Sequence, residues 1–322
     1  MSILFLKPAL VKKDAWGGRR LIDDYGMKTD LPNVGEAWMM SCHEDGESHV
    51  IGGEYDGYTL ERALAHMDGD PVGLKARDFE DFPLLIKLID ARDDLSVQVH
   101  PDDEYAEEHE RDKRGKTECW YILDADEGAE LIYGFRHDMT SDEFRRSIAD
   151  NTLLEYCNRV KVHPGDTAFI PSGTLHAIGK GILLAEVQQS CNTTYRVYDY
   201  DRLVDGEKRE LHVDKAVDVT NCTPPEYSLE PEGMPVMHDG WKSLLLRECD
   251  YFIMSLVEVD GMYADSADED SFVSIIVLEG DGEITGSDGG IFSVKKGDSI
   301  FIPANDGNFY VSGKVKLLVT TL

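Results

Sequence analysis

Hydrophobic and polar positions alternate with a period of two, or form short apolar runs, along most of the chain. Gly, Pro, Asp and Asn punctuate these segments, and β-branched and aromatic residues are frequent within them. The clearest segments are LLIKLI at 84–89, LSVQV at 95–99, CWYIL at 119–123 and ILLAEVQ at 182–188. Such closely spaced short strands predict a mainly β protein, arranged as a sandwich or a barrel.

A few segments have helical spacing instead. Residues 59–67 place apolar side chains on one helical face, and residues 140–150 begin with Thr140 and Glu143 at the spacing of a capping box. The acidic stretch 102–115 is typical of an exposed helix or a lid. We expect these helices to be insertions that decorate the β framework.

The segment 221–241 separates two regions rich in predicted strands. It contains many Pro, Gly and Glu residues and has neither the helical nor the strand period, which is typical of a linker. Residues 251–322 are again strand-like. We therefore expect two domains, a larger one at residues 1–240 and a smaller β domain at residues 241–322.

The two regions share an internal repeat. VHPGDTAFIPSG at 162–173 is similar to VKKGDSIFIPAN at 294–305, with the Gly-Asp pair and the Phe-Ile-Pro triplet in register. In the first copy His176 lies five residues after Pro171, whereas Asn308 takes that place in the second copy. The repeat predicts one structural unit used twice, with metal-binding capacity only in the first.

Composition and charge narrow the classes of partner. The 322 residues are 42% hydrophobic, which is ample for buried cores. Asp and Glu number 63 against 32 Lys and Arg, giving a formal net charge of −31, which disfavours nucleic acid and anionic membrane surfaces as partners. The simplest interpretation of the charge is solubility, and an anionic substrate would need a local basic pocket.

The sequence also indicates the cellular compartment in which the protein is found. Residues 1–18 place a short apolar run before the lysines and contain no signal-peptide cleavage site, and no run of about twenty apolar residues could span a membrane. The six cysteines are scattered, without metal-binding or redox spacing, and are expected to be reduced. We therefore expect a cytoplasmic protein.

A candidate metal ligand lies at the end of the first repeat. Residues 165–176, GDTAFIPSGTLH, have the form Gly-x5-Pro-x-Gly-x2-His, which resembles the second motif of the cupin superfamily. A tight turn, a short strand and a Pro-x-Gly turn would direct His176 into a barrel. A lone histidine is more often a core residue satisfied by hydrogen bonds, but the motif favours a metal ligand. The resemblance implies an all-β chain with two cupin, or jelly-roll, barrel units and helical insertions.

Further ligands are expected from neighbouring strands. Gln98 and His100 lie two residues apart and leave the same face of a strand, although such a pair could equally lie on a solvent-facing edge. Glu118 begins an apolar strand, with Lys116 two residues earlier. Together with His176 these residues offer only nitrogen and oxygen donors, which suits zinc, or alternatively manganese, iron or cobalt.

Two arginines follow the next predicted strand. Arg196 and Arg202 are interleaved with aromatic residues, and the fork geometry of arginine suits a phosphate group. In a chain with a net charge of −31 they indicate capture of an anion. The competing interpretation is that Arg196 pairs with Asp199, Asp201 or Asp205 on the surface.

Together these segments are similar to class I mannose-6-phosphate isomerases, in particular to the short bacterial form of this zinc-dependent cupin family. The similarity covers nearly the whole chain and adds WGG at 16–18 and GEAWMMSCHEDGESHV at 35–50 to the segments above. It implies one zinc ion per chain, bound by residues that match the ligand positions of the family: Gln98, His100, Glu118 and His176. It also implies that Arg196 is an active-site residue and that Lys116 is a candidate for proton transfer or substrate binding.

The chain departs from the family pattern in two places. Thr117 replaces a proline between Lys116 and Glu118, which changes local rigidity more than chemistry. Asn192 lies where many members carry an aspartate considered for proton transfer, and an amide cannot be a base. We expect Asn192 and Arg202 to bind substrate, Arg202 because related longer enzymes place a phosphate-associated lysine there.

The resemblance implies interconversion of D-mannose 6-phosphate and D-fructose 6-phosphate through a metal-stabilised cis-enediol intermediate, with Lys116 as the first candidate base. Two alternatives remain at this point. One is a metal-dependent cupin oxygenase, and the other is a non-catalytic cupin that binds sugar phosphate. The sequence leaves open whether the chain is a monomer or a homodimer.

Overall fold

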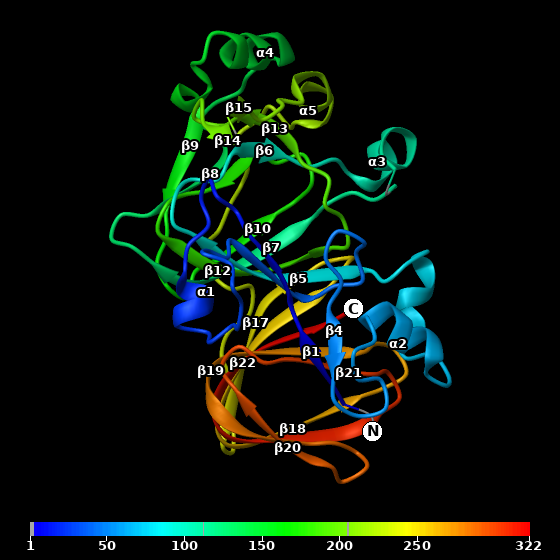
Figure 1. Cartoon of the computed structure of the whole chain (residues 1–322). Helices are drawn as coiled ribbons and strands as arrows, with labels where there is room; N and C mark the ends of the chain where they lie inside the picture. The colour runs from blue at the N-terminus through cyan, green and yellow to red at the C-terminus, as the bar shows by residue number, and fades with distance from the viewer. Residues whose placement is uncertain (1–2, 112, 205) are drawn as a thin grey trace.

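The computed structural model describes residues 3–111, 113–204 and 206–322. These residues form three large antiparallel sheets and a two-stranded ribbon, with short helices at the periphery (Figure 1). The mainly β architecture with helical insertions is therefore confirmed. The chain folds into an upper part built mostly from residues before 240 and a lower part dominated by the C-terminal strands.

Two sheets of the upper part share one apolar core. The six-stranded sheet has the order β10 (Thr167–Ile170), β7 (Glu118–Ala125), β12 (Ile182–Gln189), β5 (Leu84–Ala91), β3 (Glu36–Met40) and β2 (Ala9–Val11). The five-stranded sheet has the order β13 (Tyr195–Tyr198), β6 (Val97–Val99), β11 (His176–Ile178), β8 (Glu130–Phe135) and β9 (Cys157–Lys161). Trp120 and Leu184 of the first sheet and Leu131 and Ile178 of the second belong to the same buried cluster. The region between the sheets is where inward-facing polar residues can form a site.

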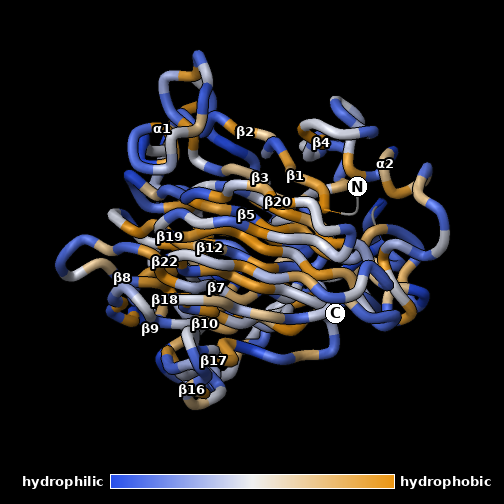
Figure 2. Tube along the Cα trace, turned by 90° about the horizontal axis from the view of Figure 1, so that it is seen from below, coloured by the Kyte–Doolittle hydropathy of each residue, from blue (hydrophilic) through white to orange (hydrophobic). Residues whose placement is uncertain are grey.

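The third sheet contains the C-terminal strands and two strands from the beginning of the chain. Its order is β16 (Val236–His238), β17 (Trp241–Glu248), β18 (Ile253–Ala267), β22 (Gly307–Thr321), β19 (Val273–Thr285), β21 (Ser299–Ile302), β1 (Leu4–Lys7) and β4 (His49–Ile51), with β20 (Ile291–Lys295) paired to β19. The small ribbon joins β14 (Leu203–Val204) to β15 (Glu207–Lys208). Apolar positions concentrate along the strands of the sheets, as Figure 2 shows.

The helices are short. They are α1 (Arg20–Asp23), α2 (Leu60–His66), α3 (Asp103–His109), α4 (Ser141–Ala149) and α5 (Val213–Val219), with 3-10 turns at η1 (Leu74–Asp78) and η2 (Leu153–Glu155). The predicted capping box of α4 is confirmed, because Thr140 and Glu143 each accept a hydrogen bond from the other's backbone N–H. Only the first half of the predicted 102–115 helix forms, as α3.

The internal repeat has the same conformation in both copies. Gly165 and Gly297 have φ of 98° and 90°, and Gly173 and Asn305 have φ of 79° and 64°. These residues bracket β10 in one copy and β21 in the other. Left-handed conformations suit glycine and asparagine, which explains why the repeat keeps these residue types. One turn–strand–turn unit is therefore used twice.

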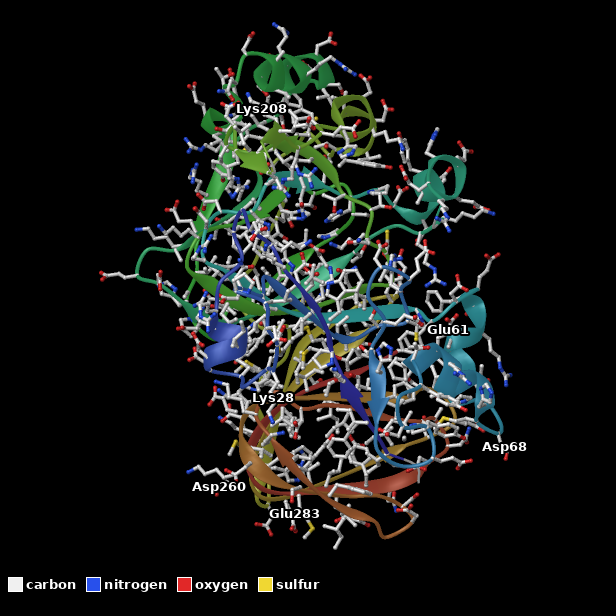
Figure 3. The ribbon with its side chains drawn as sticks, viewed as in Figure 1. Lys28, Glu61, Asp68, Lys208, Asp260 and Glu283 are labelled. Atoms are coloured by element: carbon white, nitrogen blue, oxygen red, sulfur yellow. The ribbon has the colours of Figure 1, made fainter. Side chains whose placement is uncertain are left out.

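Charged side chains project from the surface of both parts of the molecule, as Lys208 illustrates for the upper part and Asp260 and Glu283 for the lower part in Figure 3. Glu61 and Asp68 project from the segment around α2. Among the described residues, no helix is both long enough and apolar enough to cross a membrane. The segment 221–241 runs over the surface and ends in β16, and its Leu229 carbonyl accepts a hydrogen bond from Thr167 of the upper part.

Candidate metal centre and active site

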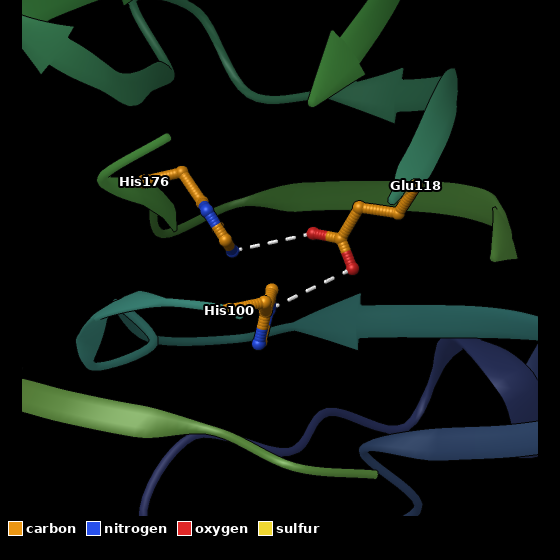
Figure 4. A group of neighbouring side chains, drawn as sticks. All are labelled: His100, Glu118 and His176. Atoms are coloured by element: carbon orange, nitrogen blue, oxygen red, sulfur yellow. Dashed lines mark ion pairs between the residues drawn. The ribbon is translucent and has the colours of Figure 1, made fainter. Parts of the chain in front are cut away.

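The structure brings His100, Glu118 and His176 together between the two upper sheets (Figure 4). Their candidate ligand atoms all lie within 4.8 Å of one another. Nε2 of His176 is 3.2 Å from Oε1 of Glu118, and Nε2 of His100 is 3.8 Å from Oε2. All three side chains are almost completely buried, with at most 1% exposure. This is the one group of this kind found among the described residues.

Backbone carbonyls fix the orientation of both imidazole rings. Nδ1 of His100 is 2.8 Å from the carbonyl oxygen of Thr193, and Nδ1 of His176 is 2.8 Å from that of Thr174. A carbonyl can only accept, so each Nδ1 carries the proton and each Nε2 presents a lone pair to the centre. Burial, together with the nearby charge of Lys116, holds the pKa of His100 well below its usual range and lowers that of His176 to about 4. Both rings are therefore neutral, as metal ligands must be.

Glu118 is a buried carboxylate with too few hydrogen-bond partners for its two oxygens. Neither of its oxygens accepts a hydrogen bond of ordinary geometry, although Nζ of Lys116 lies 2.6 Å from Oε2 as an ion pair. Burial raises the pKa of Glu118 to about 7, against the opposing effect of Lys116. Buried charges normally pair or coordinate a metal, and one lysine leaves part of this carboxylate unsatisfied. The donor set of two neutral imidazoles and one carboxylate therefore fits a divalent metal ion.

Gln98 completes one side of this centre. In the strand register His176 on β11 is paired with Gln98 on β6, which is paired in turn with Arg196 on β13. Directly paired residues project from the same face of a sheet, so the three side chains form a row. The amide nitrogen of Gln98 is placed 3.4 Å from Nε2 of His176. Rotation of the amide by 180° would present the oxygen instead, and the two orientations are equivalent in shape.

Lys116 lies at the edge of the centre and is 5% exposed. Its Nζ is 3.2 Å from Nε2 of His100 as well as 2.6 Å from Glu118. Burial alone would lower the pKa of Lys116, but the charges of Glu118 and Glu186 outweigh it and raise the pKa. The group is therefore an ammonium ion that faces the same space as the candidate ligands.

A cavity of about 300 Å³ opens next to the centre. Gln98, Lys116, Asn192 and Arg196 line it, so four of the predicted site residues share one space. Nε of Arg196 donates to Oγ of Ser96, and Nδ2 of Asn192 donates to Oδ2 of Asp45 at 2.9 Å. Arg202 is not among the lining residues: its guanidinium group contacts Asp199 and the carbonyl of Asp94.

The cavity also contains charged residues that the sequence interpretation missed, notably Lys87, Glu186 and Arg209. Lys87 and Glu186 are 4% and 2% exposed, and their charged atoms are 3.2 Å apart. The sequence did contain a signal for Lys87 and Glu186, because each is the one charged residue of an apolar segment. In the structure the two segments pair as strands, with Lys87 opposite Glu186. Arg209 gave no such signal because it lies in a polar loop.

Comparisons with known proteins identify the family. Residues 4–134 match the family model of the phosphomannose isomerase type I catalytic domain, and residues 242–322 match that of the mannose-6-phosphate isomerase cupin domain. The chain is 40% identical to mannose-6-phosphate isomerase ManA of Bacillus subtilis, over 99% of this chain and 98% of that protein. It is 38% identical to a mannose-6-phosphate isomerase of Streptococcus mutans, over 98% and 97% of the two chains.

The structural comparison agrees with the sequence comparison. The crystal structure of the mannose 6-phosphate isomerase from Bacillus subtilis superposes with a TM-score of 0.91 and 37% identity, with both chains covered completely. The similarity therefore includes both β units and their connection. The chain belongs to the type I mannose-6-phosphate isomerase family and has the cupin fold of that family.

Proposed function

We propose that this protein interconverts D-mannose 6-phosphate and D-fructose 6-phosphate. Membership of the type I family, with identity above a third over the full chain, supports an isomerase. The observation that carries the proposal is the buried His100–Glu118–His176 group beside a cavity lined by cationic side chains. Such a cavity suits an anionic sugar substrate despite the net charge of −31.

We propose zinc as the metal, held by His100, Glu118 and His176 with Gln98 as a fourth ligand. The donor set of nitrogen and oxygen atoms fits zinc, and the neutral state of both histidines supports coordination. When bound, the ion would supply Lewis acidity toward a substrate oxygen. The carbonyls of Thr193 and Thr174 hold the two rings in the tautomer that coordination requires.

Lys116 is our candidate for proton transfer between C1 and C2 of the substrate. Lys116 lines the cavity, and its Nζ is 3.2 Å from Nε2 of His100, a candidate ligand, which supports a role close to the reacting carbons. The raised pKa favours its ammonium form, which donates protons or hydrogen bonds to a substrate oxygen. To accept a proton from carbon, the ammonium group must first give up one of its own protons, and weaker pairing with Glu118 would lower its pKa toward that neutral state. A metal-site carboxylate and a substrate-polarised water are the alternative bases.

Substrate binding is assigned to the cationic end of the cavity. Arg196 projects from β13 in the same row as Gln98 and His176, where it can stabilise negative charge or hold the phosphate group. Asn192 lines the cavity and provides an amide for sugar hydroxyl groups. We propose that Arg202 contributes through its positive charge, since its side chain contacts Asp199 outside the cavity lining.

We further propose that residues 241–322 form a smaller cupin-like domain without metal ligands, and residues 1–240 the catalytic domain. None of the six cysteines forms a disulfide, which supports our proposal of a cytoplasmic protein. The oligomeric state is proposed to be monomer or homodimer, and no nucleic acid or membrane partner is expected from the acidic surface.

The reaction is tested by incubating purified, zinc-loaded protein with mannose 6-phosphate while ketose formation and oxygen consumption are both recorded. We expect one molecule of fructose 6-phosphate to form for each molecule of mannose 6-phosphate consumed, without oxygen uptake. Oxygen uptake coupled to loss of the sugar would indicate the oxygenase alternative. Saturable binding of mannose 6-phosphate without any product would indicate the binding protein instead.

A further inference from the structure

Three arginines surround a single carboxylate at one end of the active-site cavity. Asp199 is 7% exposed, and both Arg202 and Arg209 form ion pairs with it. Arg209 contributes two parallel contacts, with its Nε 2.8 Å from Oδ2 and its Nη2 on Oδ1. Arg196 lies next to this group, so three positive charges share one neutralising side chain.

The three arginines differ in where they point. Arg202 is held by Asp199 and by the carbonyl oxygen of Asp94, and it is not part of the cavity lining. Arg196 and Arg209 both line the cavity. The side chain of Arg209 is 24% exposed, which leaves it accessible while its Nε and Nη2 are fixed by Asp199.

Backbone contacts place Arg209 beside Arg196. The carbonyl of Glu210 accepts a hydrogen bond from Nη1 of Arg196 at 3.1 Å, and the backbone N–H of His212 donates to the carbonyl of Arg196. Arg196 has no carboxylate within ion-pair distance among the described residues. Burial and the nearby charges of Arg209 and Arg202 lower its pKa against the opposing attraction of Asp199 and Glu210, so the positive charge of Arg196 is only partly compensated. An anion bound here would supply the missing charge.

The distance from the candidate metal centre suits the two ends of one substrate. His176, Gln98 and Arg196 are consecutive partners across three strands, so His176 and Arg196 are separated by two strand spacings, about 10 Å. In a hexose 6-phosphate the reacting carbons C1 and C2 and the phosphate lie at opposite ends of the six-carbon chain. A substrate with C1 and C2 beside Glu118 therefore directs its phosphate toward the arginines.

We propose that Arg209, together with Arg196, binds the phosphate group of the substrate, and that Asp199 orients Arg209 for this contact. This inference rests on the proposed isomerase function and assigns the phosphate subsite within it. Asp199 uses the Nε–Nη2 edge of Arg209 and leaves the Nη1–Nη2 edge available to give a phosphate two hydrogen bonds. Arg202, in contrast, contacts Asp199 and the carbonyl of Asp94 with both ends of its guanidinium group. Arg209 is thus a specificity residue that favours phosphorylated over unphosphorylated sugars.

The test compares Arg209→Gln with wild-type protein in steady-state kinetics, with inorganic phosphate as a competitive inhibitor. We expect the KM for mannose 6-phosphate and the inhibition constant of phosphate each to rise at least about tenfold, with kcat changed by less than about threefold. Arg209→Lys, which keeps the charge without the fork, should give an intermediate KM. Asp199 keeps Arg202 as a partner in both variants, so neither leaves a buried charge unpaired.

Two further variants complete the design. Arg145→Gln removes an arginine that pairs with Asp214 at the surface and should leave KM and phosphate inhibition at their wild-type values. Arg202→Gln should raise KM less than Arg209→Gln does. The proposal is overturned if Arg209→Gln keeps the wild-type KM and phosphate inhibition, or if Arg202→Gln has the larger effect. Should Arg209→Gln fail to fold, an unchanged KM in Arg209→Lys would overturn it equally.

Failure of the isomerase proposal would give a different pattern. In that case wild-type protein would form no fructose 6-phosphate, and the anion site would be tested by direct calorimetric titration with inorganic phosphate. Weaker phosphate binding by Arg209→Gln than by wild type supports the subsite regardless of turnover, and equal binding overturns it.

Discussion

At the scale of single residues, the buried negative charge of Glu118 is the central electrostatic feature of the candidate metal centre. It is completely buried and lies between two neutral histidines and the ammonium group of Lys116. A carboxylate in this position costs free energy in the absence of a second cation, because a single lysine does not satisfy both oxygens. The same property makes it a strong ligand for a divalent ion.

Lys116 provides the sharpest test of proton transfer. The change Lys116→Met keeps the length and apolar stem of the side chain but removes the proton-carrying group. We expect kcat to fall at least about a hundredfold, because a positioned acid or base contributes factors of that size, while KM changes little. Lys295→Met, at a lysine that is 75% exposed in the C-terminal sheet, is the matched control. Near-normal turnover of Lys116→Met would remove Lys116 from the chemical step.

A second residue-scale prediction concerns pH and stability. Glu36 is buried, and although burial opposes its charge, Lys13 and Lys87 lower its pKa to about 2. Because the folded pKa lies below the unfolded one, the stabilisation is present above pH 4.5 and is lost as the pH falls toward 2.

Glu36→Gln should therefore reduce the free energy of unfolding by about 3 kcal/mol at neutral pH. The deficit relative to wild type should shrink as the pH falls from the unfolded pKa of 4.5 toward the folded pKa of about 2, as measured by urea unfolding at each pH. Glu283→Gln, at an exposed position, serves as the control. A deficit that stays constant through this pH range would contradict the assigned ionic partners.

The grouping of the candidate ligand residues was predictable from sequence for a physical reason. His176 lies at a fixed distance from a Gly-Asp turn and a Pro-x-Gly turn. Gln98 lies in β6 and His100 directly after it, two residues further on, so local geometry largely determines their direction. The structure brings His100, Glu118 and His176 together as expected. The role of Arg209 was not predictable, because its position depends on the path of a loop and on contacts with Asp199 and Arg196.

At the scale of elements, local patterns located most strands but not their true lengths. Strand β5 extends from Leu84 to Ala91, two residues beyond the apolar run, because its partner β12 continues to pair with it as far as Ala91. Strand β6 is shorter than predicted and covers only Val97–Val99. The full lengths of the long strands β18 and β22 were obscured by glycines that interrupt the alternation.

Glycines also permit close contact between the long strands. Gly280 has φ of 80°, and a Cβ atom there would lie 2.0 Å from the carbonyl oxygen of Lys314 on the neighbouring strand. It follows a register shift between Val277 and Glu279, so the strand bends at this point. Glycine is therefore required for two separate reasons, its backbone conformation and the absence of a side chain.

The substitution Gly280→Ala separates these reasons when compared with Gly128→Ala. Gly128 has nearly the same φ, 79°, but beyond its chain neighbours no atom lies within 4 Å of the point that a Cβ would occupy. We expect Gly128→Ala to cost about 1 kcal/mol from conformation alone, and Gly280→Ala to cost at least about 3 kcal/mol because the strands must separate. Chemical denaturation measures both, and equal costs would contradict the proposed close contact.

At the scale of the whole molecule, the two β units are closely joined. Strands β1 and β4 from the start of the chain extend the C-terminal sheet through pairing of β1 with β21. A buried apolar cluster contains Leu88 and Val187 of the upper part together with Leu256 and Leu318 of the C-terminal sheet. Local patterns specify strands but not distant partners, which is why this pairing could not be predicted from the sequence.

One hydrogen-bond chain links the turn between β17 and β18 to the start of β7, where the candidate ligand Glu118 lies. The hydroxyl of Tyr251 donates to Asp103 at 2.7 Å, and Asp103 accepts from the backbone N–H of Gly115 and from the amide of Gln189. Oε1 of Gln189 accepts in turn from the backbone N–H of Thr117, next to Glu118. The C-terminal unit thereby helps to position the beginning of β7.

Tyr251→Phe should consequently affect activity as well as stability. We expect a loss of about 1–2 kcal/mol in the free energy of unfolding, typical of a hydrogen bond to a carboxylate, together with a several-fold lower kcat. Tyr263→Phe is the matched control, because the hydroxyl of Tyr263 also donates to an aspartate, Asp265, but within the C-terminal sheet. Equal activity of the two variants would mean that Tyr251 serves stability alone.

Metal dependence of the isomerase reaction tests the proposed site and the proposed activity together. Purified protein is freed of metal with a chelator, assayed for conversion of mannose 6-phosphate to fructose 6-phosphate, and assayed again after addition of zinc, with metal content measured at each stage. Glu118→Gln is treated in parallel. We predict that activity disappears with the metal and returns at one zinc ion per chain, and that Glu118→Gln neither retains zinc nor turns over substrate. Full activity in protein shown to contain no metal would contradict a metal-dependent isomerase.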